Sequence, residues 1–382
     1  MNHPADDIAI IGAGPLGLAT ALALARRGHT PQIFDARSAA ASQTDSRILA
    51  LSQGSRDLLE LLGAWPAAQA TPIRRILVSQ QGHFGQTHLD VTEQRVAALG
   101  YVVPARHLTA ALQASARAWG LRVAYDTRAK LQHADSTQAS LQITHADASL
   151  HEVRTSLIAH CEGHIPDAEV ALSRDYDQHA LLCRATPATP HENLAHERFT
   201  PQGPLALLPH GSDYAVVWTV SAARADALMS APDTEWLAQI QAAIGPHIQL
   251  TNISERARHP LGLRMRSQTT GPRCVWLGNA AQTLHPVAGQ GFNLALRDAW
   301  ELADTLTGAA DPGAPDLLAR YARRRQPDRQ GAARFTDLLV RSFSNDQPLL
   351  AAARGAGLLA LDALPPLRGF VARRMIYGAR NF

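Results

Sequence analysis

A glycine-rich turn close to the N-terminus is the first place where residue type and spacing point to chemistry. Gly12, Gly14 and Gly17 form a GxGxxG pattern directly after the short apolar run Asp7–Ile11. In a strand-to-helix turn, the first glycine permits the bend, the second lets a pyrophosphate approach the backbone, and the third lets the helix pack on the sheet. The unpaired N–H groups at the start of the helix attract phosphate. The turn therefore predicts a dinucleotide site; a glycine-rich turn without a ligand is the alternative.

A carboxylate stands where such a site needs one. The expected helix covers Leu16–Arg27, and a second apolar run, Pro31–Phe34, ends on Asp35. A carboxylate at that point can accept hydrogen bonds from a ribose diol. The motif alone does not choose between NAD and FAD.

Two later segments favour FAD. Residues 278–294, GNAAQTLHPVAGQGFNL, resemble the Gly-Asp-Ala-Ala…His-Pro…Gly-Gln-Gly-x-Asn motif that meets the flavin in the FAD-dependent aromatic hydroxylases. Asp45–Ser52 resembles the Arg-Ala-Leu segment of the same family. In the longer motif, a polar side chain suits the ribityl hydroxyls and the glycines let the backbone approach the ring. The helix that then begins at Asn293 would stabilise negative charge on the reduced flavin.

The resemblance implies a class A flavin monooxygenase. In that family NAD(P)H reduces FAD, O2 adds at the flavin C4a position, and the hydroperoxide transfers oxygen to an electron-rich phenol. Pro286 is expected beside the reacting oxygen, and His285 is expected there either as a base or as a local hydrogen-bonding group. The FAD contacts that the resemblance implies are Gly12, Gly14, Gly17, Asp35, Arg47, Arg106, Asn279, Gly289, Gly291 and Asn293.

Within that family, the chain resembles the hydroxylases of ubiquinone biosynthesis. Four features carry the resemblance: Asn279 in place of the wider family's Asp, the Gln80–Gly85 segment, the Glu197–Pro209 segment, and Tyr321–Arg329 followed by Thr336-Asp337. The implied substrates are a polyprenylated phenol and O2, and other proteins of ubiquinone biosynthesis are possible partners. No nucleic-acid motif is present. A sister hydroxylase acting at another ring position is the alternative.

One segment departs from the family. Where the family has Ala-Asp-Gly followed by Ser-x-x-Arg, Ala159–Asp167 reads AHCEGHIPD. Glu162-Gly163 can stand in for Asp-Gly, but no Ser or Arg follows at the matching places, which bears on the use of NAD(P)H. A non-catalytic flavoprotein that serves as a scaffold is therefore a second alternative. The neighbouring His160, Cys161 and His164 lack a second ligand pair at zinc spacing, so we expect no metal.

The order of apolar runs predicts how these segments are positioned. We expect an α/β fold: a Rossmann-type FAD-binding domain with a parallel sheet, an inserted β-rich substrate domain and a C-terminal helical segment. The FAD-binding domain is expected from residues 1–75, 100–165 and 270–320, the substrate domain from 76–99 and 166–269, and the helical region from 321–382. Beyond Pro315 we expect helices broken at Pro327, Pro348 and Pro365-Pro366.

Length and composition agree with this organisation. A chain of 382 residues exceeds the size at which one core stops growing, so about two domains are expected. The 46% hydrophobic and 18% charged content excludes disordered and fibrous classes. Three scattered cysteines form no disulfide framework, and no apolar run is long enough to span a bilayer. We expect a cytoplasmic protein, either free or peripheral on the inner face of the membrane.

The C-terminal region is strongly basic. From Arg320 onward there are 12 arginines and four aspartates, whereas the net charge of the whole chain is +3. Apolar residues between Leu358 and Ile376, beside Arg368, Arg373 and Arg374, could form a helix that lies on an anionic membrane. A helix that caps the domain, with its arginines in solvent, is the alternative.

Overall fold

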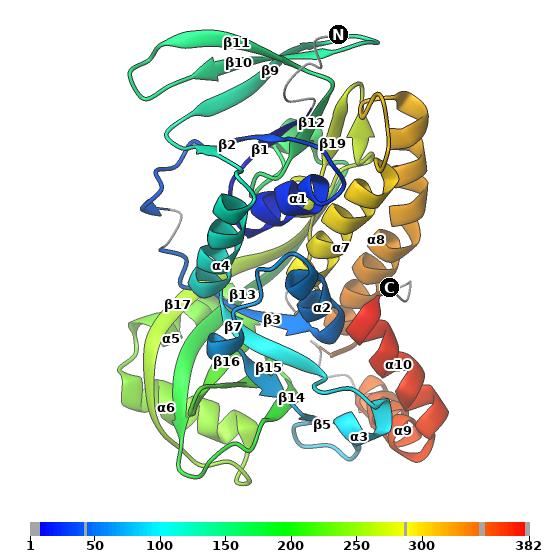
Figure 1. Ribbon diagram of the computed structural model, residues 1–382. Helices are drawn as coiled ribbons and strands as arrows, with labels where there is room; N and C mark the ends of the chain where they lie inside the picture. The colour runs from blue at the N-terminus through cyan, green and yellow to red at the C-terminus, as the bar shows by residue number, and fades with distance from the viewer. Residues whose placement is uncertain (1–7, 42–43, 286–288, 344–347, 379–382) are drawn as a thin grey trace.

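The computed structural model describes residues 8–41, 44–285, 289–343 and 348–378. Its two main sheets lie in different halves of the molecule: a parallel sheet with helices in the upper half of Figure 1, and a larger, mostly antiparallel sheet in the lower half. The predicted α/β class, with a parallel sheet, a strand-rich second unit and C-terminal helices, is confirmed.

The six-stranded sheet has the order β18-β19-β12-β1-β2-β8 and is parallel except for β18. Its strand β1 reads IAII and is buried on both faces, as is usual for a central parallel strand. Alternate residues therefore serve two cores. The strands are β1 (Ile8–Ile11), β2 (Gln32–Phe34), β8 (Val123–Ala124), β12 (Leu157–His160), β18 (Thr270–Gly271) and β19 (Cys274–Trp276).

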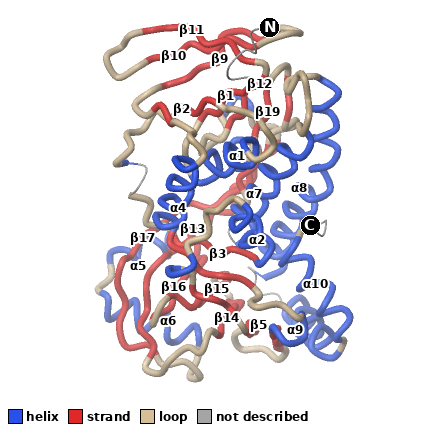
Figure 2. Tube along the Cα trace, in the orientation of Figure 1, coloured by secondary structure: helices blue, strands red, loops and turns tan. Residues whose placement is uncertain are grey.

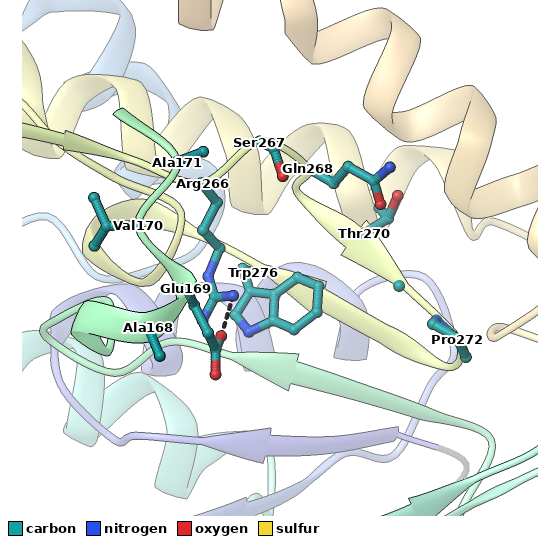
Figure 3. Close-up of a pocket in the computed structure, with 11 residues that line it drawn as sticks. Ala168, Glu169, Val170, Ala171, Arg266, Ser267, Gln268, Thr270, Pro272 and Trp276 are labelled. Carbon is teal, nitrogen blue, oxygen red and sulfur yellow. Dashed lines mark ion pairs between the residues drawn. The ribbon is translucent and has the colours of Figure 1, made fainter. Parts of the chain in front are cut away.

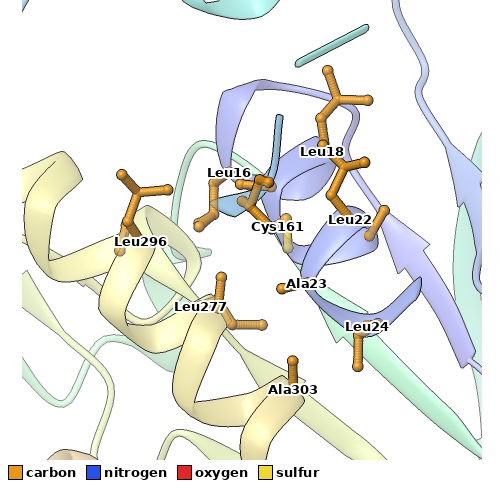
Figure 4. Close-up of a cluster of buried hydrophobic side chains, with 14 of the residues drawn as sticks. Leu16, Leu18, Leu22, Ala23, Leu24, Cys161, Leu277, Leu296 and Ala303 are labelled. Carbon is orange, nitrogen blue, oxygen red and sulfur yellow. The ribbon is translucent and has the colours of Figure 1, made fainter. Parts of the chain in front are cut away.

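Helices cover one face of this sheet. Figure 4 shows the core between them, where side chains of α1 meet Leu277 and the helix α7. Helix α1 is apolar almost all round, because α4 and α7 pack on it as well as the sheet. The helices of this layer are α1 (Pro15–Ala25), α2 (Gln53–Leu61), α4 (Ala105–Ala118), α7 (Gln290–Thr305) and α8 (Pro315–Phe343).

A three-stranded antiparallel sheet covers the other face. Ala9 and Ile11 of β1 pack against Leu141 and Ile143 of β10. This sheet lies at the top of Figures 1 and 2. Its strands are β9 (Arg128–Ala134), β10 (Ala139–Thr144) and β11 (Leu150–Thr155).

The eight-stranded sheet has the order β20-β17-β13-β16-β15-β14-β5-β6. Helices α5 (Ala222–Ser230) and α6 (Asp233–Ile244) cover one of its faces and share a core with it. Its strands are β5 (Arg75–Gln80), β6 (Gln86–Asp90), β13 (Leu172–Pro187), β14 (Leu194–Thr200), β15 (Gly203–His210), β16 (Asp213–Ser221), β17 (Leu250–Met265) and β20 (Gln282–Thr283).

A small sheet joins the two halves. Strand β7 pairs antiparallel with β3 and with β4, and Val102 of β7 packs with Ile73 of β4 and Ala195 of β14. The joining strands are β3 (Ile48–Ser52), β4 (Thr71–Ile73) and β7 (Gly100–Pro104). Elsewhere the chain forms the short helix α3 (Val91–Gln94) and the 3₁₀ turns η2 (Ala67–Gln69), η3 (Asp167–Glu169) and η4 (Gly278–Ala280).

The C-terminal helices follow the side of the molecule at the right of Figure 1. Helix α8 continues through Pro327, which we expected to break it. The prediction was wrong because proline loses one backbone hydrogen bond but keeps a helical φ, and buried ion pairs at neighbouring positions hold the helix. The predicted breaks at Pro348 and Pro365-Pro366 are confirmed: new helices, α9 (Pro348–Ala363) and α10 (Pro365–Tyr377), begin there, at a favoured place for proline.

Two features of the eight-stranded sheet were not predicted. The segment Phe199–Leu208 contains a hairpin, in which β14 and β15 pair antiparallel on either side of a turn between Thr200 and Gly203. The 16-residue strands β13 and β17 were not predicted. The pairing of these two strands contains register shifts. Such shifts break the alternation of apolar and polar residues from which a strand is predicted.

Candidate active site

The glycine turn between β1 and α1 is closed at two positions and accessible at the third. Gly12 has a φ of +102°, and a Cβ there would lie 2.9 Å from the carbonyl oxygen of Cys161. A Cβ on Gly17 would overlap the carbonyl oxygen of Gly12. At Gly14 the nearest atom to an added Cβ is Arg37 Nη2, at 3.7 Å. The turn thus packs tightly against β12 and presents the start of α1, where a phosphate would bind.

Asp35 lies at the end of β2 and is 4% exposed. Its Oδ2 accepts a hydrogen bond from the Ala13 amide (2.7 Å) and another from Arg37 Nη2 (2.8 Å). Burial would raise the pKa of Asp35, but the hydrogen bonds from Arg37 and Ala13 outweigh it and hold the pKa below its usual value. The carboxylate is therefore ionised and tied to the glycine turn, and a ribose would share it with Arg37.

The predicted flavin segment runs from β19 through η4 and β20 to the start of α7. Asn279 and Gly291 are exposed, so both are accessible to a ligand. Gly289 precedes α7 with a φ of +60°, and a Cβ there would lie 3.0 Å from Ala50 Cβ on β3. Pro286 lies outside the described residues.

Asn293 ties this segment to β3. Its Oδ1 accepts hydrogen bonds from the Ser52 amide (2.8 Å) and Ser55 Oγ (2.6 Å). Its Nδ2 donates to the carbonyl oxygens of Ala50 (3.0 Å) and Gly289 (2.7 Å). Because these four bonds use both ends of the amide, Asn293 acts by holding the loop in place.

Arg47 and Arg106 are brought together by the pairing of β3 with β7. The Ala105 amide donates to the Arg47 carbonyl oxygen (2.8 Å), and Arg106 lies in the first turn of α4. The Arg47 side chain is 54% exposed and pairs with Asp45 at 2.6 Å. Arg106 is exposed as well, so both arginines are accessible from the solvent.

His285 is buried in the middle of the flavin segment, just after β20. Its ring makes an edge contact with Tyr176 of β13, with 5.5 Å between ring centroids. The Tyr176 hydroxyl donates to Asp337 Oδ1 of α8 at 3.0 Å. Burial lowers the pKa of His285 to about 4, so its imidazole is neutral at pH 7. Protonating it is unfavourable, which fits a local hydrogen-bonding group better than a base.

Buried ion pairs fix α8 against α7 and β20. Arg297 Nε donates to Asp328 Oδ2 (2.7 Å), and Arg325 bridges Asp298 Oδ1 (2.6 Å) and Asp328 (2.9 Å). Gln282 Nε2 donates to Asp298 Oδ2 at 3.0 Å, so the network reaches β20. The resemblance of Tyr321–Arg329 to the family therefore has a structural basis: this segment supports the flavin segment from behind.

The segment that departs from the family lies at the end of β12. His160 and Glu162 hydrogen-bond to each other at 3.1 Å, and the Cys161 amide donates to the Ile11 carbonyl oxygen at 2.8 Å. Burial raises the pKa of the Cys161 thiol to about 12. Cys161 is therefore a packing residue.

A cavity of about 450 Å³ opens beside this strand end. Figure 3 shows Arg266 between Trp276 and Glu169, and Arg266 forms an ion pair with Glu169. The Arg266 guanidinium carbon is 4.3 Å from the centroid of the Trp276 ring, on which the His160 ring also stacks. This cavity was not predicted, because its lining comes from two stretches far apart in the chain, residues 168–171 and 266–276.

Two residues at the site were also missed. Arg37 covers Asp35, and its only sequence signal is its place two residues further on. Tyr176 reaches His285 from β13, a strand that was not predicted. By contrast, the glycine turn, Asp35 and the flavin segment all follow the carboxyl ends of strands in the parallel sheet. Arg47 directly precedes β3, and Arg106 lies in the first turn of α4.

Comparison with known proteins agrees with this geometry. A family model described as FAD binding domain matches residues 6–336. A protein named ubiquinone hydroxylase UbiL from Rhodospirillum rubrum is 31% identical over 95% of this chain and 87% of its own. The 3-demethoxyubiquinol 3-hydroxylase of Escherichia coli K12 is 32% identical over 95% of this chain and 96% of its own.

Solved structures share the fold at lower identity. The p-nitrophenol 4-monooxygenase PnpA of Pseudomonas putida superposes with a TM-score of 0.78 at 12% identity, covering 97% of each chain. PqsL of Pseudomonas aeruginosa, described as a probable FAD-dependent monooxygenase, gives a TM-score of 0.74 at 20% identity, covering 93% of this chain and 99% of its own.

The residues present fit FAD. Two glycines of the turn sit where a Cβ would strike the backbone, an ionised carboxylate stands at the ribose position, and exposed backbone at Gly291 leads into a helix start. The glycine turn suits the pyrophosphate, the carboxylate suits the ribose, and the exposed backbone at the helix start suits the flavin ring.

Proposed function

The chain belongs to the FAD binding domain family, and on that premise we propose that it hydroxylates the aromatic ring of a polyprenylated phenol in ubiquinone biosynthesis. FAD is the cofactor, and NAD(P)H and O2 are the co-substrates. The observation that carries the proposal is that the glycine turn, Asp35 and the flavin segment all follow the carboxyl ends of strands in the parallel sheet. The chain is also about 30% identical to two proteins named as ubiquinone hydroxylases. Such a cofactor, when reduced, activates O2 for transfer to an electron-rich ring.

The protein's own residues bind, orient and exclude water. The Gly12–Gly17 turn and the start of α1 receive the pyrophosphate, and Asp35 receives the adenosine ribose. Gly289, Gly291 and the start of α7 would hold the flavin ring, and the positive end of the helix would stabilise negative charge there. Asn293 holds this loop to β3, and the ion pairs of α8 hold it from behind. A dry site prevents unproductive reaction with water.

We also propose that the protein meets its lipid substrate at a membrane surface through α9 and α10. The residues that would contact the membrane differ from those predicted from the sequence. Leu358 and Ile376 are buried, and Arg368 is 8% exposed with its Nη2 2.7 Å from Glu93 Oε1. These three residues cap the domain, so their predicted membrane role was wrong. Among the described helices, none is long and apolar enough to cross a bilayer.

The outward face of the two helices is apolar. We call Leu359, Leu364, Leu367 and Phe370 the apolar tip; their exposed fractions run from 43% to 69%. Arg373, one of the predicted basic residues, is exposed beside it. A surface helix of this kind binds by burying apolar area among lipid headgroups and by attraction of its arginines to acidic lipids. A polyprenylated phenol partitions into the same layer.

Gene deletion with identification of the accumulating precursor tests the proposal. We expect a prenylated phenol that lacks one ring oxygen. Complementation with the wild type should remove it, and complementation with Gly17→Ala, which cannot form the cofactor turn, should not. The altered Cys161-Glu162-Gly163 motif favours the scaffold alternative, in which the cofactor-free variant would complement as well as the wild type. A different precursor would identify another ring position.

A further inference from the structure

An acidic side chain stands in an apolar row of the eight-stranded sheet. Glu197 of β14 is opposite Val78 on β5 and Ala206 on β15. Ala206 is in turn opposite Val217 on β16, and Val217 is opposite Leu182 on β13. Directly opposed residues share a face of the sheet. Glu197 is therefore the one ionisable member of a five-strand row.

The strand register defines which way this row faces. Arg198, the next residue, donates from Nε to the Ala243 carbonyl oxygen of α6 at 2.9 Å. The row of His196 includes Leu207 and Val216, which belong to the core beneath α5 and α6. Because neighbouring side chains of a strand point to opposite faces, Glu197 points away from α6.

The face that carries Glu197 looks toward the flavin segment. Ala195, two residues earlier on the same face, packs with Ile73 of β4 and Val102 of β7, with Ile48 of β3 against them. Strand β3 is also the strand whose Ala50 accepts the hydrogen bond of Asn293. In the other direction, Phe199 is opposite Gln80, against which Gly355 of α9 lies. Glu197 thus stands between the flavin edge and α9.

Among the described residues, no charged side chain shifts the pKa of this carboxyl. Burial alone raises the pKa of Glu197 to about 7, although the residue is only half-buried. The other described ionisable residues on this face of the sheet lie toward the far end of β15 and β16 or on β13 and β17; they are Arg184, His210, Asp213 and His259. Helix α9 carries Arg354 and Asp362, and Asp362 Oδ1 accepts a hydrogen bond from the His88 amide of β6 at 3.3 Å.

We propose that Glu197 accepts the hydrogen bond of the substrate's phenolic hydroxyl and so orients the ring at the flavin edge. This inference rests on the proposed function. A carboxyl in an apolar wall is costly unless a donor meets it, and a phenol is an apolar ring with one donor. An ionised carboxylate that accepts this bond also raises the electron density of the ring, which favours its attack on an electrophilic oxygen.

Binding of 2-allylphenol and of its methyl ether, 2-allylanisole, to the FAD-loaded protein tests the inference. Dissociation constants would be measured by calorimetry and flavin difference spectra from about pH 5.5 to 8.5, on either side of neutrality. The variants are Glu197→Gln, the conservative Glu197→Asp, and the control Glu192→Gln, whose side chain is 75% exposed and pairs with Arg75. FAD content and far-UV circular dichroism establish that each variant is folded.

The wild type should bind the phenol about tenfold more tightly above pH 7 than at pH 5.5, because a bond to a charged acceptor is about twice as strong as a neutral one. Glu197→Gln should bind it about tenfold more weakly at high pH, with no pH dependence. Glu197→Asp should restore the pH dependence, Glu192→Gln should match the wild type, and the ether should bind independently of pH.

Two failures are distinguishable. If the wild type hydroxylates the phenol but Glu197→Gln keeps its affinity and pH profile, the inference is overturned and the proposed function stands. If the wild type neither binds nor hydroxylates the phenol while holding FAD, the proposed function fails and this inference with it.

Discussion

Replacing Asp328 by Asn should destabilise the protein strongly, because Asp328 is shared by two buried arginines. The side chains of Arg297, Arg325 and Asp328 are 5–6% exposed, and the two ion pairs to Asp328 measure 2.7 and 2.9 Å. Without the carboxylate, Arg325 keeps its bond to Asp298 (2.6 Å), whereas Arg297 loses its ion pair with Asp328. Removing one partner of a buried ion pair costs about 3–5 kcal/mol. Since the network supports β20, FAD affinity should fall as well.

The free energy of unfolding, measured by urea denaturation at a fixed excess of FAD, checks this value. Glu152→Gln is the matched control, because its pair with Arg154 is exposed (3.1 Å, side chains 49% and 66% exposed). Exposed pairs contribute about 0–1 kcal/mol. A loss below about 1 kcal/mol for Asp328→Asn would refute the reasoning.

The pH dependence gives an independent check of the same network. Burial raises the pKa of Asp328, but Arg297 and Arg325 outweigh it and leave the pKa below its usual value. A lowered carboxyl pKa adds stability above the unfolded-state value of about 4, and this stability is lost as the pH falls through the folded-state value. The difference between wild type and Asp328→Asn should therefore be constant near neutrality and shrink below about pH 4. A difference that grows in acid would contradict the assignment.

Three further predictions follow from the cofactor turn and the apolar tip. Asp35→Ala should weaken FAD binding about ten- to hundredfold without unfolding the protein, from loss of about 1.5–3 kcal/mol of charge-assisted hydrogen bonding; an unchanged dissociation constant would exclude a ribose contact. Gly17→Ala should yield protein without FAD, because its Cβ overlaps the Gly12 carbonyl oxygen; normal flavin content would show that the turn can open. Leu367→Ser with Phe370→Ser should reduce co-sedimentation with anionic vesicles at least about tenfold, since each side chain is worth up to about 1.5–3 kcal/mol when buried; equal sedimentation would remove the membrane proposal.

The local parts of the fold could be predicted from the sequence. The glycine turn, Asp35 and the helix starting near Asn293 lie in short segments whose spacing reflects backbone geometry. The turn needs a φ of +102° at Gly12 and close contact at Gly17. Because only glycine meets both needs easily, the glycines themselves predict the turn.

Side-chain partners far apart in the chain could not be predicted. Arg368 was predicted at a membrane surface, with a solvated arginine as the alternative, but it is buried against Glu93, 275 residues away. Pro327 looked like a helix break, but ion pairs from α7 compensate for the missing hydrogen bond. Glu197 stood in a segment that resembles the ubiquinone hydroxylases, yet only the pairing of five strands reveals which face it occupies. Such facts depend on tertiary packing, which periodicity does not encode.

The most direct test of the proposed function is transfer of oxygen from isotopically labelled O2 to a prenylated phenol. The purified protein, loaded with FAD and supplied with NADH or NADPH, would be incubated with the phenol, and the product analysed by mass spectrometry. We predict a ring-hydroxylated product that contains one labelled oxygen atom and forms together with oxidised nicotinamide. Labelled product should be absent with Gly17→Ala. Oxidation of the nicotinamide without labelled product, or product oxygen that comes from water, would contradict the assignment as a phenol monooxygenase.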